Sequence, residues 1–110
     1  MQVLDWGVLM SLDDASDRAL LEEVTDKVVG IWAEVLEIER SAIDPHKSDF
    51  FELGGYSLLV LQSISRLLAE QGISEEEGQE LEGLLLNELF EKPTAAAQAE
   101  CLLRNMSVQA

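Results

Sequence analysis

The chain has 110 residues, of which 22 are acidic and 7 basic, giving a formal net charge of −15 at pH 7. This length corresponds to a single domain, and the charge excludes electrostatic attraction to nucleic acid phosphates or anionic lipid headgroups. Partner proteins are therefore expected to present basic surfaces. Apolar residues make up 47% of the chain, but no unbroken apolar run is long enough to cross a bilayer, so no membrane association is expected.

The N-terminus and the single cysteine predict a cytoplasmic protein. Residues 1–12 contain Asp5 and lack both a basic region and a small-residue cleavage site, so they do not resemble a signal peptide. Cys101 cannot form an intrachain disulfide, which suits a reducing compartment, and we interpret it as a helical core thiol without chemistry. Because the chain begins with Met1 and contains no second module, we expect a free-standing monomer.

Apolar residues recur at spacings of three and four in the first part of the chain, which predicts an amphipathic helix. The predicted buried stripe comprises Leu20, Leu21, Val24, Val28, Ile31, Trp32, Val35 and Leu36. The helix is expected to begin somewhere from residue 12 to residue 18, because both Ser11 and Ser16 precede acidic residues as N-caps do. We therefore treat residues 1–17 as an N-terminal extension.

Residues 39–56 lose this periodicity and contain one proline and two glycines, which predicts a long loop. Phe50, Phe51 and Leu53 are expected to tether the loop to the core, and Phe51 is assigned to the core together with Trp32. Apolar anchors of this kind argue against disorder, and a long ordered loop in a small domain is usually functional.

Three further helical segments are expected after the loop. The first begins at Ser57, carries a packed stripe of Val60, Ile64, Leu67 and Leu68, and ends at Gly72. The second opens with a capping-box pattern, Ser74 with Glu77, and is strongly acidic. The last is expected to open at Pro93 and to end near Arg104, leaving residues 105–110 as a tail.

With no alternating strand pattern, the economical architecture is all-α. We predict a four-helix bundle with a long loop between the first and second helices. The domain itself is expected to span residues 18–104.

Two glycines lie just before the helix that begins at Ser57, and one residue, Tyr56, separates them from the serine. Gly54 and Gly55 tolerate positive φ and carry no side chain, so a second protein can bring its active site up to the serine hydroxyl. Unpaired N–H groups at the start of the helix favour a phosphate group attached there. The alternative is that Ser57 only caps the helix, a common role for serine.

The Gly-Gly-Tyr-Ser stretch that ends at Ser57 resembles the attachment motif of carrier proteins, in the form typical of peptidyl carrier (thiolation) domains of nonribosomal peptide synthesis. Residues 31–36 resemble the first helix of this family, and residues 89–94 resemble the end of its third helix. The resemblance extends from about residue 20 to residue 103. It implies an acyl-carrier-like four-helix bundle with 4'-phosphopantetheine, transferred from coenzyme A, on Ser57.

The resemblance also implies what the chain does and with which proteins. The arm ends in a thiol that carries an aminoacyl or acyl group as a thioester, and the chain itself is not an enzyme. Its partners would be a phosphopantetheinyl transferase, an adenylation or other acyl-loading enzyme, and condensation or tailoring enzymes. Gly54, Gly55 and Tyr56 would lie beside the attached arm.

Two departures from the family pattern stand out. The segment between Gly72 and Phe90 is longer and more acidic than usual. Relative to the family it is expected to be an acidic helical insert before the third helix and to change the choice of partners. Ser63 stands where the family usually has a large apolar residue, which is expected to alter packing of the second helix. Neither departure touches the attachment motif.

Leu58 to Leu61 are consecutive, and at about 100° per residue they surround the helix, so some must be exposed. Because Val60 belongs to the packed stripe, we assign Leu58 and Leu61 to an exposed face beside Ser57. An exposed apolar pair is a natural contact for partner enzymes, and the matching positions in carrier proteins resemble recognition residues.

Three alternatives remain open at this point. An acyl carrier of polyketide or fatty-acid type usually has aspartate where this chain has Tyr56. A serine hydrolase would need a second glycine at Leu59 and would have to use the single histidine, His46, as its base. An acidic adaptor would never carry an arm. No residue cluster has metal-ligand spacing, so no metal site is expected.

Overall fold

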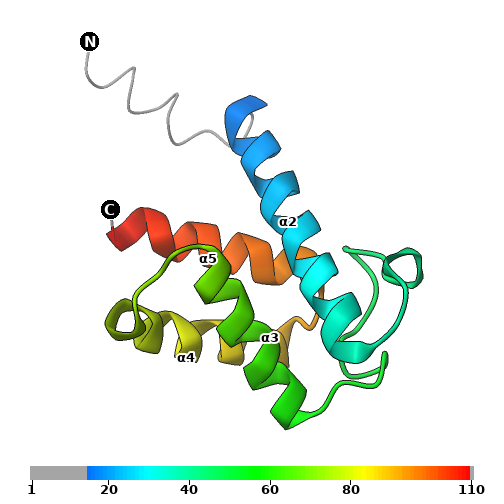
Figure 1. Ribbon diagram of the computed structural model, residues 1–110. Coiled ribbons are helices and arrows are strands. Elements are labelled where there is room, and N and C mark those ends of the chain that lie inside the picture. The colour runs from blue at the N-terminus through cyan, green and yellow to red at the C-terminus, as the bar shows by residue number, and fades with distance from the viewer. Residues whose placement is uncertain (1–14, 110) are drawn as a thin grey trace.

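The computed structural model describes residues 15–109. In chain order its elements are α2 (Ala15–Leu36), the 3-10 helix η1 (Arg40–Ala42), α3 (Ser57–Glu70), α4 (Glu75–Glu91) and α5 (Ala95–Gln109). Helix α2 packs against α3 and α5, and α4 packs against the same two helices, while the long loop lies at one end of the bundle (Figure 1). The predicted all-α four-helix architecture is confirmed. No helix in the described part is both long and apolar enough to span a membrane.

Helix α2 begins at Ala15, within the predicted interval, so the last residues of the predicted extension are helical. Residues 1–14 of that extension lie outside the described residues. The buried stripe is confirmed at Val24, Val28, Ile31 and Trp32, but Leu20 is 47% exposed. The prediction for Leu20 is wrong because the covered face of α2 passes through the neighbouring Leu21, which is partly buried against the core. The first turns of α2 project from the bundle (Figure 1).

Helix α3 carries the predicted stripe, with Val60, Ile64, Leu67 and Leu68 all buried. It ends as predicted, because Gly72 adopts a φ of 72° and the next N–H, of Ile73, returns to the carbonyl of Leu68 at 3.1 Å. Ser63 is buried on the same side and donates a hydrogen bond to the Val60 carbonyl at 2.9 Å. A small polar residue is therefore accommodated within the packed stripe by bonding to its own helix.

The acidic segment is not a separate insert before the third helix. It forms nearly all of α4, which runs unbroken from Glu75 to Glu91. Ser74 caps it as predicted, with its hydroxyl accepting from the Glu77 N–H at 3.3 Å. Acids in the first turn interact favourably with the helix dipole. Each glycine inside α4 costs about 1 kcal/mol of helix propensity, and burial of Leu81, Leu85 and Leu89 at 0–1% exposure outweighs this cost.

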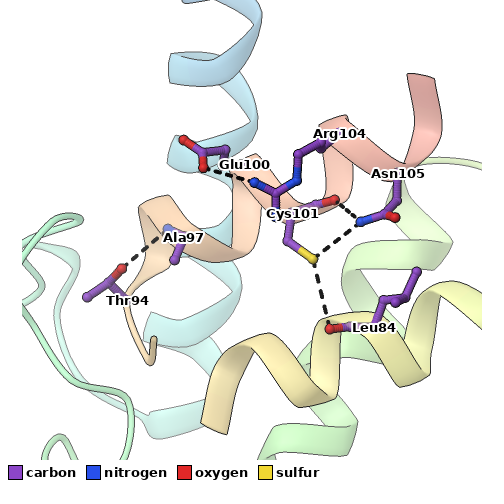
Figure 2. Close-up of polar contacts among 7 residues, drawn as sticks. All are labelled: Leu84, Thr94, Ala97, Glu100, Cys101, Arg104 and Asn105. Carbon is purple, nitrogen blue, oxygen red and sulfur yellow. Dashed lines mark hydrogen bonds and ion pairs between the residues drawn. The ribbon is translucent and has the colours of Figure 1, made fainter. Parts of the chain in front are cut away.

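Helix α5 begins at Ala95 rather than at Pro93. The Thr94 hydroxyl accepts a hydrogen bond from the Ala97 N–H at 3.3 Å and so acts as the cap (Figure 2). The helix continues to Gln109, so the expected tail is helical over residues 105–109. Gln98, whose burial the sequence did not predict, is 2% exposed and donates its side-chain amide to the Leu85 carbonyl at 2.9 Å.

The loop between α2 and α3 is tied to the core by Phe50, which is fully buried and contacts the Trp32 ring with a centroid distance of 4.9 Å. Phe51 packs against the core, as a tether of the loop should, but it is only half-buried, so the prediction that it is a core residue is confirmed only in part. The side chains of consecutive residues in a turn point in different directions, and here the Phe50 side chain points into the core. Its backbone N–H also donates to the Pro93 carbonyl at 2.9 Å, joining the loop to the connection between α4 and α5.

Candidate functional site

Ser57 is the first helical residue of α3 and is exposed. The N-cap position belongs to Tyr56, whose backbone is extended and whose carbonyl accepts the first helical hydrogen bond, from Val60 at 3.0 Å. No side chain caps α3, and within residues 15–109 the Ser57 hydroxyl has no hydrogen-bond partner. Ser57 therefore does not cap α3, and its hydroxyl is free to react.

The approach to Ser57 is a tight turn organised by Asp49. Its carboxylate accepts hydrogen bonds from the backbone N–H groups of Phe51, at 2.7 Å, and Glu52, at 3.2 Å. Its carbonyl accepts a third, from Leu53 at 3.0 Å. A short acidic side chain that bonds to the backbone two residues ahead is a standard turn-forming device. The turn is thus fixed by local hydrogen bonds just before the two glycines.

The two glycines are required for different reasons. Gly54 has a φ of 109°, a conformation that side chains disfavour, and a Cβ there would have no atom within 4 Å. Gly55 lies directly on the Phe50 ring, because a Cβ at that position would be 2.2 Å from a ring carbon. The sequence predicted free access at both positions. The structure shows that access is open at Gly54, whereas Gly55 allows the backbone to pass over a buried ring.

The surface around Ser57 is apolar. Tyr56 is 57% exposed, Leu58 55% and Leu61 42%, whereas Val60 between them is fully buried. The predicted division of the consecutive leucines, with Leu58 and Leu61 outside, is confirmed as a matter of exposure. Their role in the recognition of partner enzymes stays a prediction.

The same surface carries little charge. Helix α3 contains one basic and one acidic residue, Arg66 and Glu70, both in its C-terminal half. Arg66 forms an ion pair with Glu34 of α2. The acids in the first turn of α4 have no counterpart on α3. The face beside Ser57 is therefore suited to apolar contact rather than to charge attraction.

These residues fit a phosphopantetheine group. Its phosphate would lie at an uncapped helix N-terminus, where unpaired N–H groups and the helix dipole favour negative charge. Open space at Gly54 and the exposed hydroxyl of Ser57 leave the attachment point accessible.

The structure does not bring together the residues that a serine hydrolase would need. His46 is exposed, and its backbone N–H donates to the Asp44 carboxylate at 2.9 Å. It lines a cavity of about 730 Å³ between α2 and the start of α5, and Ser57 does not line this cavity. The described residues also contain no group of three or more His, Cys, Asp or Glu side chains able to hold a metal ion.

Cys101 is a core thiol, as predicted, with 3% exposure. Figure 2 shows its sulfur directed from α5 toward α4, where the Leu84 carbonyl is the hydrogen-bond acceptor at 3.9 Å. The Asn105 amide lies 3.5 Å from the same sulfur. Burial, and secondly the negative charge of Glu88, raise the pKa of the Cys101 thiol above its ordinary value. Cys101 is therefore a poor nucleophile in the folded protein.

The family model for the phosphopantetheine attachment site matches residues 26–102, well over half of the chain. Among curated proteins, the chain is 42% identical to one of the linear gramicidin synthase proteins of Brevibacillus parabrevis over 98 residues, which is 89% of the chain and 2% of that protein. It is 38% identical to a second protein of the same synthase over 94 residues, or 84% of the chain and 1% of that protein.

A fungal protein, malpinin synthetase of Mortierella alpina, is 40% identical over 91 residues, covering 83% of the chain and 1% of that protein. The chain thus spans only one or two hundredths of the length of the relatives it matches. No solved structure matches significantly. The family match and the likeness to several peptide synthases agree with the motif and fold described above. The chain therefore belongs to the phosphopantetheine attachment site family, as a carrier domain of the peptidyl type with phosphopantetheine as its prosthetic group.

Proposed function

We propose that Ser57 is the residue to which 4'-phosphopantetheine is attached, and that the protein thereby presents an aminoacyl or acyl group to enzymes of nonribosomal peptide synthesis. The observation that carries this proposal is the exposed hydroxyl of Ser57, without a hydrogen-bond partner in the described residues, at the uncapped start of α3. The peptide synthases among its relatives support the proposed pathway class.

Each residue near Ser57 has a definite part in this proposal. The Ser57 oxygen attacks the pantetheine-bearing phosphate of coenzyme A, and a transferase supplies the base that removes its proton. The pyrophosphate bond of coenzyme A breaks as the ester forms, and adenosine 3',5'-bisphosphate leaves. The first N–H groups of α3 stabilise the negatively charged phosphodiester. Gly54 and Gly55 shape the turn that presents Ser57, and Tyr56 lies beside the arm. When bound, the arm supplies a flexible thiol that holds the cargo as a thioester.

The proposed partners are a phosphopantetheinyl transferase, an adenylating or other acyl-loading enzyme, and condensation or tailoring enzymes. The chain itself contributes no catalysis in this proposal. Partners would contact the apolar face formed by Leu58 and Leu61, both of which are exposed. The expectation that the protein acts as a free-standing chain stays a prediction.

Thiol reactivity offers a test that does not depend on knowing the cargo. Before modification, the folded protein should have no fast-reacting thiol, because its single cysteine is buried and should react at least about a hundredfold more slowly than an exposed thiol. After incubation with coenzyme A, magnesium and a broad-specificity transferase, and removal of free coenzyme A by gel filtration, the protein should carry one fast-reacting thiol, brought by the arm. A disulfide reagent with a coloured product measures both.

The variant Cys101→Ala serves as the control for this assay. It should lose the slow thiol and keep the fast one that modification creates. A fast thiol in the unmodified parent would show that Cys101 is accessible. Failure of the fast thiol to appear after incubation would contradict the proposed attachment.

Leu61→Arg tests the proposed contact face. Because the Leu61 side chain is 42% exposed, the change should leave helicity and the thermal midpoint nearly unchanged. Loss of an apolar contact and burial of an unpaired charge should slow transfer of phosphopantetheine, or loading by the cognate enzyme, by about tenfold or more. The quantity to measure is kcat/KM for each reaction.

Leu84→Arg is the matched control, since Leu84 is 45% exposed but lies on α4. The control should be modified at the parental rate. If Leu61→Arg unfolds the protein, Leu61 contributes to the core, and if the variant folds and reacts normally, this face does not mediate recognition.

A further inference from the structure

Four aromatic rings form a continuous series from α2 to the surface of α4. The Trp32 ring lies 4.9 Å from that of Phe50, and the Phe50 ring lies 5.7 Å from that of Phe51, both in edge-to-face arrangements. The Phe51 ring then stacks on Phe90, with centroids 5.4 Å apart and planes 11° apart. The middle two rings belong to the loop that leads to Ser57.

Phe90 is unusual among these residues because it is 56% exposed. A large apolar side chain on the last turn of a helix contributes little to a core from this position. Its face is instead used to cover Phe51, which is half-buried. A stacked ring pair of this kind contributes beyond the area that it buries.

The rings that Phe90 supports also hold the turn before Ser57. The N–H of Gly54 donates to the Phe51 carbonyl at 3.2 Å, and the N–H of Gly55 donates to the Phe50 carbonyl at 3.0 Å. Gly55 in addition rests against the Phe50 ring. Displacement of Phe51 would therefore act directly on Gly54, through the hydrogen bond to its carbonyl, and on Gly55 through the neighbouring Phe50, whose ring contacts that of Phe51. Ser57 follows two residues after Gly55.

We propose that Phe90 is a positioning residue for Ser57, acting through its stack on Phe51 to hold the turn of residues 49–55. This inference rests on the proposed attachment at Ser57. It assigns the C-terminal end of α4 a role in presenting the serine, although α4 supplies no atom to the attachment point itself. The stack restrains the loop from outside, while Trp32 restrains it from inside.

The test compares Phe90→Ala with the parent by residue-resolved amide hydrogen exchange. Loss of the stack should speed exchange at Gly54 and Gly55 by about three- to tenfold, because their hydrogen bonds open more often. Exchange in the middle of α2 and α5 should stay at the parental rate. Phe90→Tyr, which keeps the stacked ring, should restore slow exchange at both glycines. Leu84→Ala, at an exposed leucine of the same helix, should change neither.

The same variants are then assayed for transfer of phosphopantetheine from coenzyme A to Ser57. Phe90→Ala should lower kcat/KM about three- to tenfold, and Phe90→Tyr should restore it. Unchanged exchange at the glycines, or faster exchange throughout the protein, would overturn the proposal. Slower transfer with unchanged exchange would also overturn it, because Phe90 would then act by touching the transferase.

The exchange measurement does not depend on the modification. If the parent protein were not modified at all, the proposed attachment would fail, while the exchange rates at Gly54 and Gly55 would still decide whether Phe90 holds the turn.

Discussion

Replacing Ser57 with alanine is expected to abolish attachment of phosphopantetheine while leaving the fold intact. The Ser57 hydroxyl is exposed and has no hydrogen-bond partner within residues 15–109, so its removal should change the free energy of unfolding by less than about 0.5 kcal/mol. The reaction, in contrast, loses its nucleophile. Mass spectrometry after incubation with coenzyme A, magnesium and a transferase should show one added phosphopantetheine for the parent and none for Ser57→Ala.

Ser65→Ala is the matched control, because Ser65 is also exposed on α3 but lies two turns beyond Ser57. This variant should gain the same mass as the parent. Modification of Ser57→Ala, or loss of modification in Ser65→Ala, would place the attachment elsewhere. An unchanged mass for the parent would favour an adaptor that never carries an arm.

The features of α3 that the sequence predicted correctly depend on local periodicity. Its stripe and its C-terminal glycine follow from spacing and backbone preference, which act over a few residues. The same holds for the exposure of Leu58 and Leu61, since a helix cannot direct consecutive leucines to one face. Local rules were sufficient to describe the surface next to Ser57.

The features that the sequence missed depend on contacts between distant segments. Spacing alone does not show that Phe50 rather than Phe51 faces Trp32, because that choice depends on the turn at Asp49. Burial of Gln98 requires a carbonyl on another helix, at Leu85. The exposure of Leu20, beside the partly buried Leu21, depends on which face of α2 the other helices cover.

The role of Gly55 is a further example within the candidate site. The sequence predicted that Gly55 gives a partner protein access to Ser57, but in the structure the open space is at Gly54. The need for glycine at the second position comes from the Phe50 ring beneath it. Only the folded loop brings that ring and Gly55 together.

The aromatic residues that hold the loop to the core should differ strongly in their effect on stability, according to how deeply each is buried. Trp32 is 1% exposed and Phe50 is fully buried, so truncation of either to alanine should cost about 3–5 kcal/mol. This is a large share of the stability of a small domain. Phe51 is half-buried and retains contact with the exposed Phe90, so Phe51→Ala should cost only about 1–2 kcal/mol.

Chemical denaturation followed by circular dichroism, with the slope fitted for each variant, measures these differences. Trp32→Ala should shift the midpoint far below that of the parent, and Phe51→Ala should lie between the two. Because Phe50→Ala leaves a cavity under Gly55, it should disturb the turn as well as the core. Equal losses for Phe50→Ala and Phe51→Ala would show that the two rings share the core equally, and a parental midpoint for Trp32→Ala would show that the loop is held without the inner ring.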